Sequence, residues 1–412
     1  MTTLTRAELV ELDRRDRLAP MRERFVLPEG IIYLDGNSLG PLPRATPGRI
    51  AEVVEQEWGR GLIRSWNDAG WMDMSARIAA GIARLIGAAP GTVAVGDSTS
   101  VNLFKLLGAA LRLCPGRCVI LTEAENFPTD LYMAQGLAEF LRQNHQVRTA
   151  GPEFIAESIN EDTAVVMLTH VNYRTGAMHD MRAITAAAHA RGALMLWDLA
   201  HSAGAVPLDL AECNADFAVG CGYKYLNGGP GAPAFLYIAP RLLETVRMPL
   251  TGWLGHAEPF AFEPSYRPAP GIARATVGTP SVLNLAALEV GVGTALQAPI
   301  AEVRDKSVRL TGLFAELVAQ ECGDGFRLVT PGDPAHRGSQ ICLFHPDGYA
   351  IMQALIARGV IGDFRAPGIL RFGIAPLYIR YTDVWDAVAI LRSIMQTGSW
   401  HAAEFAVRRA VT

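Results

Sequence analysis

The chain has 412 residues, of which 50% are hydrophobic and 19% are charged, and its formal net charge is −4. A composition of this kind is typical of an ordinary globular enzyme that is long enough for one large and one small domain. No dense run of lysine and arginine is present, which argues against a nucleic-acid partner and favours small-molecule substrates.

The first eight residues lead into acidic and basic residues rather than an apolar core, so we expect no signal peptide. No uncharged apolar stretch reaches the length of a membrane span. The six cysteines form no C-x-x-C pair. The closest two, Cys114 and Cys118, lack the second Cys/His pair that a zinc site needs. We therefore expect reduced thiols, no metal site and a cytoplasmic protein.

At the N-terminus, apolar residues such as Leu9 and Met21 recur at helical spacing among arginine and glutamate. We interpret residues 1–45 as a segment with an amphipathic arm, which packs on the small domain or on a partner chain. Within it, residues 31–43 form a short apolar run that is broken by glycine, asparagine and proline. Such a loop is either a structural corner or part of a pocket.

Apolar runs alternate with helical stretches from residue 93 to residue 237. The clearest helix extends from Met181 to Ala190 and is closed by Gly192. The predicted strands are apolar throughout and lie at residues 118–121, 164–168, 193–196, 217–219 and 234–237. Such strands with helices between them predict a mostly parallel sheet covered on both sides, which we place in a large domain at residues 46–281.

Polar residues follow several of these runs, where the carboxyl ends of the strands should bind ligands. Lys224 lies in a glycine-dense loop after the run at 217–219, and Asp198 follows the run at 193–196. A lysine amine and a carboxylate suit the aldehyde and the ring nitrogen of pyridoxal 5'-phosphate. The sequence therefore predicts this cofactor at the sheet edge.

A phosphate site is predicted at residues 96–103, where Thr99 and Ser100 precede leucines at helical spacing. Hydroxyls and free N–H groups at a helix start either cap the helix alone or also bind a phosphate. Phe127, Asp130 and Thr175 also follow apolar runs. Phe127 suits stacking on a flat ring, and Asp130 and Thr175 suit hydrogen bonds to its substituents, although purely structural loops are the alternative.

The chain after residue 281 changes character and predicts a smaller α+β domain at residues 282–412. Helical patterns cover residues 282–297, 301–320 and 383–395, and apolar strands lie around residues 340–344 and Arg371. A guanidinium offers a two-point grip on a carboxylate, so Arg371 and its rival Arg365 both suit a substrate carboxylate. The alternative for Arg371 is a surface ion pair.

Six motifs then occur in a characteristic order: Gly-Asn-Ser-Leu-Gly (36–40), Ser-Thr-Ser-Val-Asn-Leu (98–103), Phe-Pro-Thr-Asp (127–130), Trp-Asp-Leu-Ala-His-Ser-Ala-Gly (197–204), Tyr-Lys-Tyr-Leu-Asn-Gly-Gly-Pro-Gly (223–231) and Gly-Trp-Leu-Gly-His (252–256). Over nearly its whole length the chain resembles the kynureninases. The resemblance implies the α/β fold of pyridoxal-phosphate-dependent transferases (aspartate aminotransferase-like, fold type I), with a large mostly parallel sheet domain and a smaller C-terminal α+β domain.

The resemblance also implies the roles of individual residues. Lys224 would bind the cofactor's aldehyde, Asp198 its ring nitrogen, and Tyr223 would be a candidate proton donor. The other cofactor contacts that it implies are Thr99, Ser100, Phe127, Asp130, Thr175, His201 and Tyr223. Trp253 and Thr279 would reach the cofactor of a neighbouring subunit, which implies a homodimer. Arg371 would bind the substrate's α-carboxylate, with Asn37, Ser38 and Trp66 beside its ring.

A kynureninase would hydrolyse L-kynurenine between its β and γ carbons to anthranilate and L-alanine in tryptophan degradation, and 3-hydroxykynurenine less well. The lysine and Asp-x-x-His motifs also occur in cysteine desulfurases and transaminases, which are the enzymatic alternatives. A desulfurase needs a catalytic cysteine on a mobile loop, whereas Cys342 lies in a predicted buried strand. A cofactor-free binding or scaffold protein would need to have lost Lys224 or Asp198, and both are present.

Overall fold

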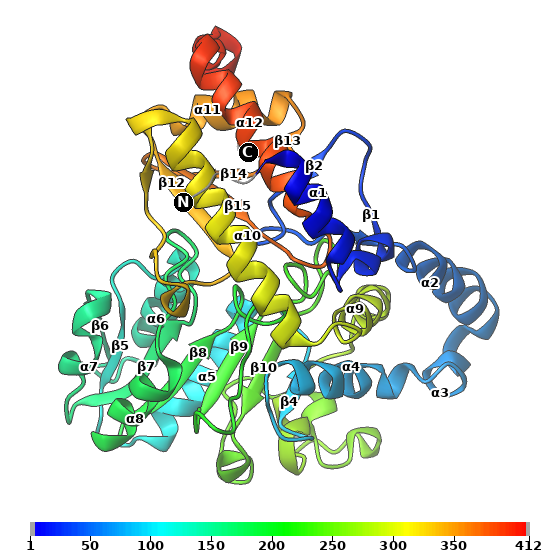
Figure 1. Cartoon of the computed structure of the whole chain (residues 1–412). Coiled ribbons are helices and arrows are strands. Elements are labelled where there is room, and N and C mark those ends of the chain that lie inside the picture. The colour runs from blue at the N-terminus through cyan, green and yellow to red at the C-terminus, as the bar shows by residue number, and fades with distance from the viewer. Residues whose placement is uncertain (1–4, 409–412) are drawn as a thin grey trace.

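The computed structural model describes residues 5–408, which form two main sheets with helices packed around them (Figure 1). The strands of the large sheet are, in spatial order, β4 (Val93–Val95), β10 (Phe235–Ile238), β9 (Phe217–Gly220), β8 (Leu194–Asp198), β7 (Thr163–Thr169), β5 (Val119–Glu123) and β6 (Gln146–Ala150). Strands β5 to β9 are parallel, and β10 is antiparallel to both β9 and β4. The predicted mostly parallel sheet is confirmed.

Side chains of the central strands alternate between two hydrophobic layers. Val166 and Trp197 face one layer and Val165 and Leu196 the other, because successive residues of a strand point to opposite faces. Both layers are buried, which is why these strands are apolar throughout. Strand β6 was not predicted, because it is an edge strand with exposed residues and its polar sequence has no apolar run.

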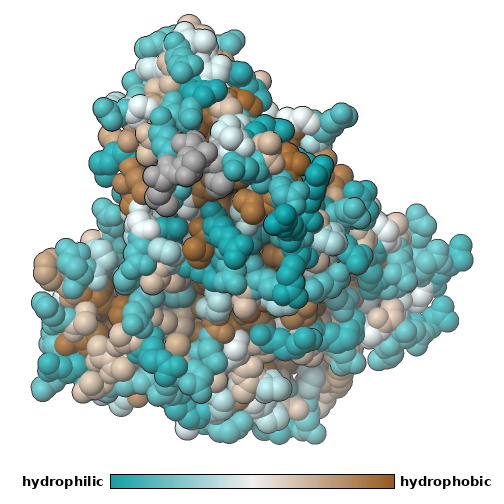
Figure 2. Space-filling model, viewed as in Figure 1, coloured by the Kyte–Doolittle hydropathy of each residue, from teal (hydrophilic) through white to brown (hydrophobic). Residues whose placement is uncertain are grey.

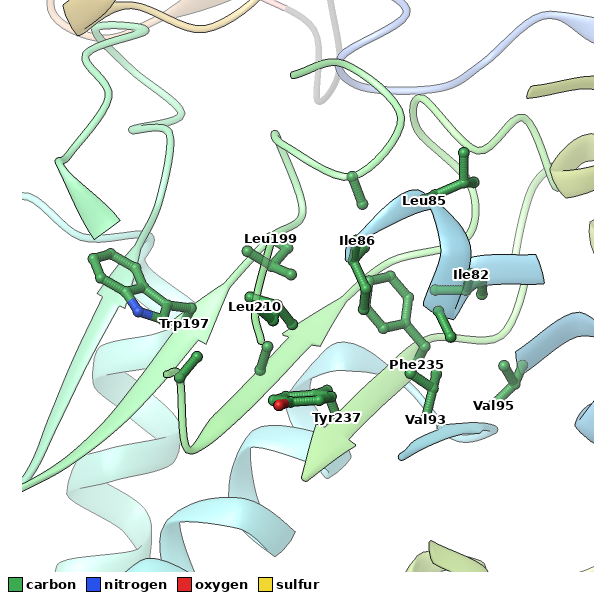
Figure 3. Close-up of a cluster of buried hydrophobic side chains, with 14 of the residues drawn as sticks. Ile82, Leu85, Ile86, Val93, Val95, Trp197, Leu199, Leu210, Phe235 and Tyr237 are labelled. Atoms are coloured by element: carbon green, nitrogen blue, oxygen red, sulfur yellow. The ribbon is translucent and has the colours of Figure 1, made fainter. Parts of the chain in front are cut away.

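Helices cover both faces of the large sheet. The first layer is closed by α4 (Trp71–Leu85), α8 (Met181–Ala190) and α9 (Val282–Ala295), and the second by α5 (Thr99–Leu113) and α6 (Pro128–Leu141). The short helix α7 (Ile155–Ser158) lies near β5. Figure 3 shows the first layer between α4 and strands β4, β8 and β10. The predicted helix at 181–190 is confirmed with the same bounds.

The small sheet is antiparallel and has the order β11 (Arg327–Leu328), β12 (Gln340–Phe344), β15 (Ile369–Gly373) and β14 (Asp363–Arg365). It shares a hydrophobic core with α10 (Ile300–Glu321), α11 (Gly348–Ala357) and α12 (Tyr381–Thr397). The C-terminal helices predicted from residues 282, 301 and 383 are therefore confirmed, with bounds that differ by a few residues.

The N-terminal segment completes the core of the small sheet. Helix α1 (Arg6–Arg15) lies against α12, and β2 (Ile32–Tyr33) pairs in parallel with β13 (Val360–Ile361) (Figure 1). Leu9, Met21 and Phe25 are buried in that core. The two strands β1 (Phe25–Val26) and β3 (Leu42–Pro43) form an antiparallel pair. Of the segment predicted at 1–45, residues 1–4 lie outside the described residues.

A projecting segment, residues 46–68, extends to one side of the molecule in Figure 1. It contains α2 (Thr46–Glu52), a π-helix at Val53–Gly61 and α3 (Ser65–Asp68). Leu62 has a φ of 55°, and Trp58, Leu62 and Ile63 are exposed. Short 3₁₀ turns occur at Ala19–Arg24, Leu62–Arg64, Pro152–Phe154, Pro240–Leu242, Trp253–Gly255, Pro259–Ala261, Gly271–Ala275, Gly323–Gly325, Pro334–His336, Ser399–His401 and Ala403–Ala406.

Among residues 5–408, no single helix combines the length and the apolar composition of a membrane span. Helices α9 and α10 meet these criteria only together, as a pair bent by 80°. Hydrophilic and apolar residues are intermixed over the face of the molecule in Figure 2.

The loop at residues 35–40 packs against the loop that carries Lys224. The Gly40 amide donates a hydrogen bond of 2.8 Å to the Tyr223 carbonyl. A β-carbon on Gly40 would lie 2.4 Å from the Lys224 carbonyl oxygen, so only glycine allows this approach of two backbones.

Replacing Gly40 with alanine should therefore separate the two loops. We expect Gly40→Ala to lower the free energy of unfolding by about 1 to 3 kcal/mol, the usual cost of overpacking, in urea denaturation. Gly48→Ala is the matched control, since no atom lies within 4 Å of its added β-carbon in helix α2. It should stabilise by roughly 0.5 to 1 kcal/mol. Equal unfolding midpoints for the two variants would contradict the close approach.

Candidate functional site

A cavity of about 390 Å³ lies beyond the carboxyl ends of β7 and β8. Eight of the sequence-predicted residues line it: Thr99, Ser100, Phe127, Asp130, Asp198, His201, Tyr223 and Lys224. They come from four separate stretches of the chain, which the sheet brings together as its topology predicts.

One end of the cavity is formed by the first turn of α5. Ser98 caps this helix by accepting a hydrogen bond of 3.3 Å from the Val101 amide. The preceding carboxylate, Asp97, is paired at 2.8 Å with Lys105, which is only 2% exposed. Because Lys105 compensates this negative charge, the hydroxyls and N–H groups at the helix start remain suited to a phosphate.

Two buried carboxylates, Asp130 and Asp198, line the cavity. Asp198 is the last residue of β8, and its side chain accepts a hydrogen bond of 2.8 Å from the Ala200 amide. Burial raises the pKa of Asp198, and the nearby Lys224 opposes that rise. Burial and the charge of Asp198 raise the pKa of Asp130 well above its usual value. Such a pair is stabilised by a further cation, and a protonated ring nitrogen is a cation of suitable size.

Lys224 and His201 are in direct contact. Their side-chain nitrogens Nζ and Nε2 lie 3.0 Å apart. Nδ1 of His201 lies 3.1 Å from Oε1 of Gln340, which belongs to β12 of the small sheet. Burial and the charge of Lys224 hold the pKa of His201 well below its usual value, so this imidazole is neutral.

Aromatic side chains border the same space. Phe127 is 40% exposed and meets the ring of Tyr173 edge to face, with 5.1 Å between the ring centroids. The ring centroid of Tyr223 lies 5.8 Å from Nζ of Lys224. Burial raises the pKa of Tyr223, so its phenol keeps its proton at neutral pH. The site thus has an aromatic face and a protonated hydroxyl near the lysine.

Arg371 is buried rather than part of a surface ion pair, so that alternative is wrong. Its Nε donates to Asp363 at 2.7 Å, its Nη1 to the Tyr173 carbonyl at 2.7 Å and its Nη2 to the Ser38 hydroxyl at 2.9 Å. Arg365 is more exposed and pairs with the same carboxylate at 2.8 Å. Arg371 does not line the cavity but contacts it through Tyr173, which does.

The remaining predicted residues lie outside this cavity. Thr175 shapes a turn, since its hydroxyl accepts a hydrogen bond of 3.1 Å from the Ala177 amide. Trp66 and Thr279 line a second cavity of about 550 Å³, which shares Asp97 with the first. Trp253 is 38% exposed on the surface. Asn37 is fully buried at the border of the two sheets, where its Nδ2 faces Oε1 of Gln340 at 3.5 Å.

Sequence reasoning missed three residues of the site. Thr169 lines the cavity, and the signal for it was its position as the last residue of β7, directly after an apolar run. Tyr173 also lines the cavity, within the same loop that pointed to Thr175. Gln340 carried no local signal, because 139 residues separate it from His201.

Comparison with protein families finds two matches within the chain. Residues 303–391 match the kynureninase C-terminal domain, and residues 62–214 match the DegT/DnrJ/EryC1/StrS aminotransferase family. Among individual proteins, the kynureninase of Pseudomonas fluorescens is 55% identical over 414 residues, which cover 99% of this chain and 100% of the relative. The kynureninase of Burkholderia pseudomallei (strain K96243) is 53% identical with the same coverage.

Solved structures resemble the fold at lower sequence identity. The apo cysteine desulfurase of Thermococcus onnurineus NA1 has a TM-score of 0.78 and 18% identity, covering 92% of this chain and 98% of that one. The C-DES structure with glycine covalently linked to its PLP cofactor has a TM-score of 0.79 and 19% identity, covering 90% and 98%. The predicted α/β aminotransferase-like fold is confirmed.

Asp35 lies beside the Arg371 cluster and should make stability depend on pH. Burial and the neighbouring Asp363 carboxylate raise the pKa of Asp35 to about 7, against partial compensation by Arg371. The unfolded chain has a pKa near 3.9, so the folded state holds the extra proton between these values. The stabilisation is thus complete below about pH 4 and is lost as the pH rises through about 7.

Asp35→Asn keeps the neutral form at every pH and should remove this dependence. For the unmodified protein, we expect a loss of about 2 kcal/mol in unfolding free energy from Asp35 between about pH 5 and pH 8. The difference between variant and unmodified protein, measured by urea denaturation, should grow over that interval. Asp324→Asn, at an exposed aspartate, is the control and should show no such trend. A pH-independent difference for Asp35→Asn would contradict the assignment.

Proposed function

The chain belongs to the kynureninase family of pyridoxal-phosphate-dependent hydrolases, and from this premise we propose that the cavity at the ends of β7 and β8 holds the cofactor and cleaves L-kynurenine. The observation that carries the proposal is that Lys224, Asp198 and the start of α5 line one cavity. Their amine, carboxylate and hydroxyl groups match the aldehyde, ring nitrogen and phosphate of pyridoxal 5'-phosphate. When bound, this cofactor supplies an electrophilic carbon and a ring that accepts electrons from the substrate.

Different residues of the chain bind different parts of the cofactor. Lys224 binds the aldehyde, and Asp198 accepts a hydrogen bond from the ring nitrogen and keeps it protonated. Thr99 and Ser100 donate hydrogen bonds to the phosphate at the N-terminus of a 15-residue helix. Phe127 covers a ring face, and Asp130 and Thr169 bind near the ring substituents. Thr175 acts indirectly, because its hydroxyl shapes the turn in the loop after β7.

Proton transfer during the reaction falls to Lys224 and Tyr223. Lys224, once released by the substrate amine, removes the proton from the substrate's α-carbon. Water adds to the substrate's γ-carbonyl, the bond between the β and γ carbons then breaks to release anthranilate, and Tyr223 donates a proton to the β-carbon that becomes the methyl group of alanine. Burial raises the pKa of Tyr223, so the phenol is protonated at neutral pH and has a proton to give at that step.

Substrate recognition is assigned to the cluster around Arg371. Its guanidinium binds the α-carboxylate of kynurenine. Arg365 is a second cation nearby, since it pairs with Asp363, the carboxylate that also pairs with Arg371. Asn37 and Ser38 come from the adjacent loop, and Trp66 borders the aromatic ring of the substrate. We propose unsubstituted L-kynurenine as the preferred substrate over its 3-hydroxy form.

We also propose a homodimer in which Trp253 and Thr279 enter the partner's site. Large apolar side chains lie exposed near these residues and on the projecting segment, which is unusual for a surface that faces water. They include Trp58, Ile63, Phe260 and Phe262, with exposed fractions of 57%, 77%, 62% and 76%. The cavity that contains Thr279 adjoins the cofactor cavity at Asp97 and Gly231, so a partner's side chains can enter at that border.

The organisation of the chain follows from the two sheets. We propose an N-terminal segment at 1–45, a large cofactor domain at 46–281 and a small domain at 282–412, of which residues 409–412 lie outside the described residues. We further propose a cytoplasmic location, which is supported by six cysteines that form no disulfide in residues 5–408.

The activity is tested by mixing the cofactor-loaded protein with L-kynurenine and, separately, with 3-hydroxykynurenine. Equimolar anthranilate and alanine should appear with L-kynurenine, faster than the products of the 3-hydroxy form. Lys224→Ala should abolish both products, while Tyr223→Phe should keep the cofactor's visible absorbance and lose turnover by about 10²-fold or more. Unchanged turnover of Tyr223→Phe would exclude it as the proton donor. Sulfide release from cysteine without anthranilate would favour a desulfurase.

The shared site is tested by mixing two inactive variants, Lys224→Ala and Trp253→Ala. A hybrid dimer contains one site with both residues intact, so about a quarter of the unmodified sites should return on random exchange of subunits. Mixing two preparations of the same variant is the control and should restore nothing. No recovery, together with a monomeric mass by light scattering, would rule out the dimer.

A further inference from the structure

The side chain of Gln340 joins three parts of the molecule at the border between the sheets. It is fully buried in β12 of the small sheet. Its Nε2 donates to the carbonyl oxygens of Asn172 and Tyr173 at 3.3 and 3.0 Å, in the loop after β7. Its Oε1 lies 3.1 Å from Nδ1 of His201 in the large domain. A glutamine with contacts on both ends of its amide has a fixed orientation.

This orientation decides which nitrogen of His201 carries the proton. Carbonyl oxygens only accept hydrogen bonds, so the amide nitrogen of Gln340 must face Asn172 and Tyr173. Its oxygen therefore faces His201, and Nδ1 must donate to it. Because His201 is neutral, Nε2 carries a lone pair and accepts a hydrogen bond from Nζ of Lys224 at 3.0 Å.

We propose that Gln340 is a positioning residue that fixes the tautomer of His201 and thereby aims the Lys224 amine into the cavity. The inference rests on the proposed role of Lys224 and deepens it. The other tautomer would turn an N–H group toward Lys224, and two donors would then face each other. The small sheet thus supplies a contact without which the lysine loses its acceptor.

The same contact ties the lysine to the substrate anchor. The Tyr173 carbonyl accepts hydrogen bonds from both Gln340 and Nη1 of Arg371, at 3.0 and 2.7 Å. Because they share this acceptor, the side chains of Gln340 and Arg371 are both fixed relative to the loop after β7. Arg371 and Gln340 lie on adjacent strands of the small sheet, β15 and β12, so both ends of the connection move as one body.

The direct test reads the tautomer of His201 in the cofactor-free protein by ¹⁵N NMR with labelled histidine, the His201 signal being assigned by its loss in His201→Asn. The unmodified protein should show Nδ1 protonated and Nε2 free. Gln340→Met removes the acceptor at similar size and should shift His201 to the other tautomer or a mixture. Gln340→Glu places a carboxylate at Nδ1, and His201 should then gain a proton in the accessible pH range.

The cofactor-loaded protein provides a second readout. Gln340→Met and Gln340→Glu should weaken cofactor binding and lower kcat about tenfold each, because one hydrogen bond to the lysine is lost. Thr330→Val is the matched control. It removes two buried hydrogen bonds of the Thr330 hydroxyl, which donates to the Thr175 carbonyl at 2.7 Å and accepts from the Cys342 amide of β12 at 2.8 Å, without touching His201. It should leave both the His201 signal and cofactor affinity unchanged.

Two results would overturn the proposal: an Nε2-protonated His201 in the unmodified protein, or a Gln340→Met variant that behaves as Thr330→Val does. If Gln340→Met does not fold, the protonation of His201 in Gln340→Glu decides the matter. Failure of the proposed function is distinguishable, because it would appear as absence of anthranilate and alanine from the cofactor-loaded protein, or as turnover in Lys224→Ala, whereas the tautomer is read without cofactor.

Discussion

A buried carboxylate is stable only where a cation or hydrogen-bond donors compensate its charge, and the cavity at the edge of the large sheet is lined by two of them, one at the end of β8 and one in the first turn of α6. Asp130 and Asp198 face one cavity with Lys224 as the nearby cation. This arrangement is costly in the empty protein and favourable once a protonated ring enters. The order of the strands in the sheet, the start of α5 and the glycine-dense lysine loop together position these charged groups around one cavity.

The small sheet likewise contains a buried charge, that of Arg371, which its hydrogen-bond partners compensate. Arg371 is buried because Asp363, Ser38 and the Tyr173 carbonyl satisfy its donors. Three of the segments involved, the N-terminal loop, the loop after β7 and the small sheet, are far apart in sequence. The N-terminal segment is therefore a structural part of the Arg371 cluster, which we propose as the substrate site, since its loop both supplies Ser38 and packs on the lysine loop.

The sequence predicted those features that leave a local pattern. Strands buried on both faces appear as apolar runs, and the helix at 181–190 has clear caps, an aspartate before it and a glycine after it. Polar residues at or beyond the carboxyl ends of the strands, such as Asp198 and Lys224, were located correctly as cavity residues, with Thr169 overlooked in favour of Thr175. Strand β6 left no apolar run, and Gln340 and the burial of Arg371 depend on contacts between distant segments, which no local pattern encodes.

The antiparallel pairing of β9 and β10 has a consequence for how the site is assembled. The lysine loop connects two neighbouring strands of one hairpin, so its ends are brought together by local contacts that form at small entropic cost. Gln340, which orients the histidine beside the lysine, emerges from the ribosome 139 residues after that histidine. During synthesis the hairpin can therefore close long before its orienting partner exists. A nascent chain that ends between the hairpin and Gln340 would contain Lys224 but not the residue that orients its acceptor, His201. The complete catalytic arrangement therefore forms only after the C-terminal part of the chain has been made.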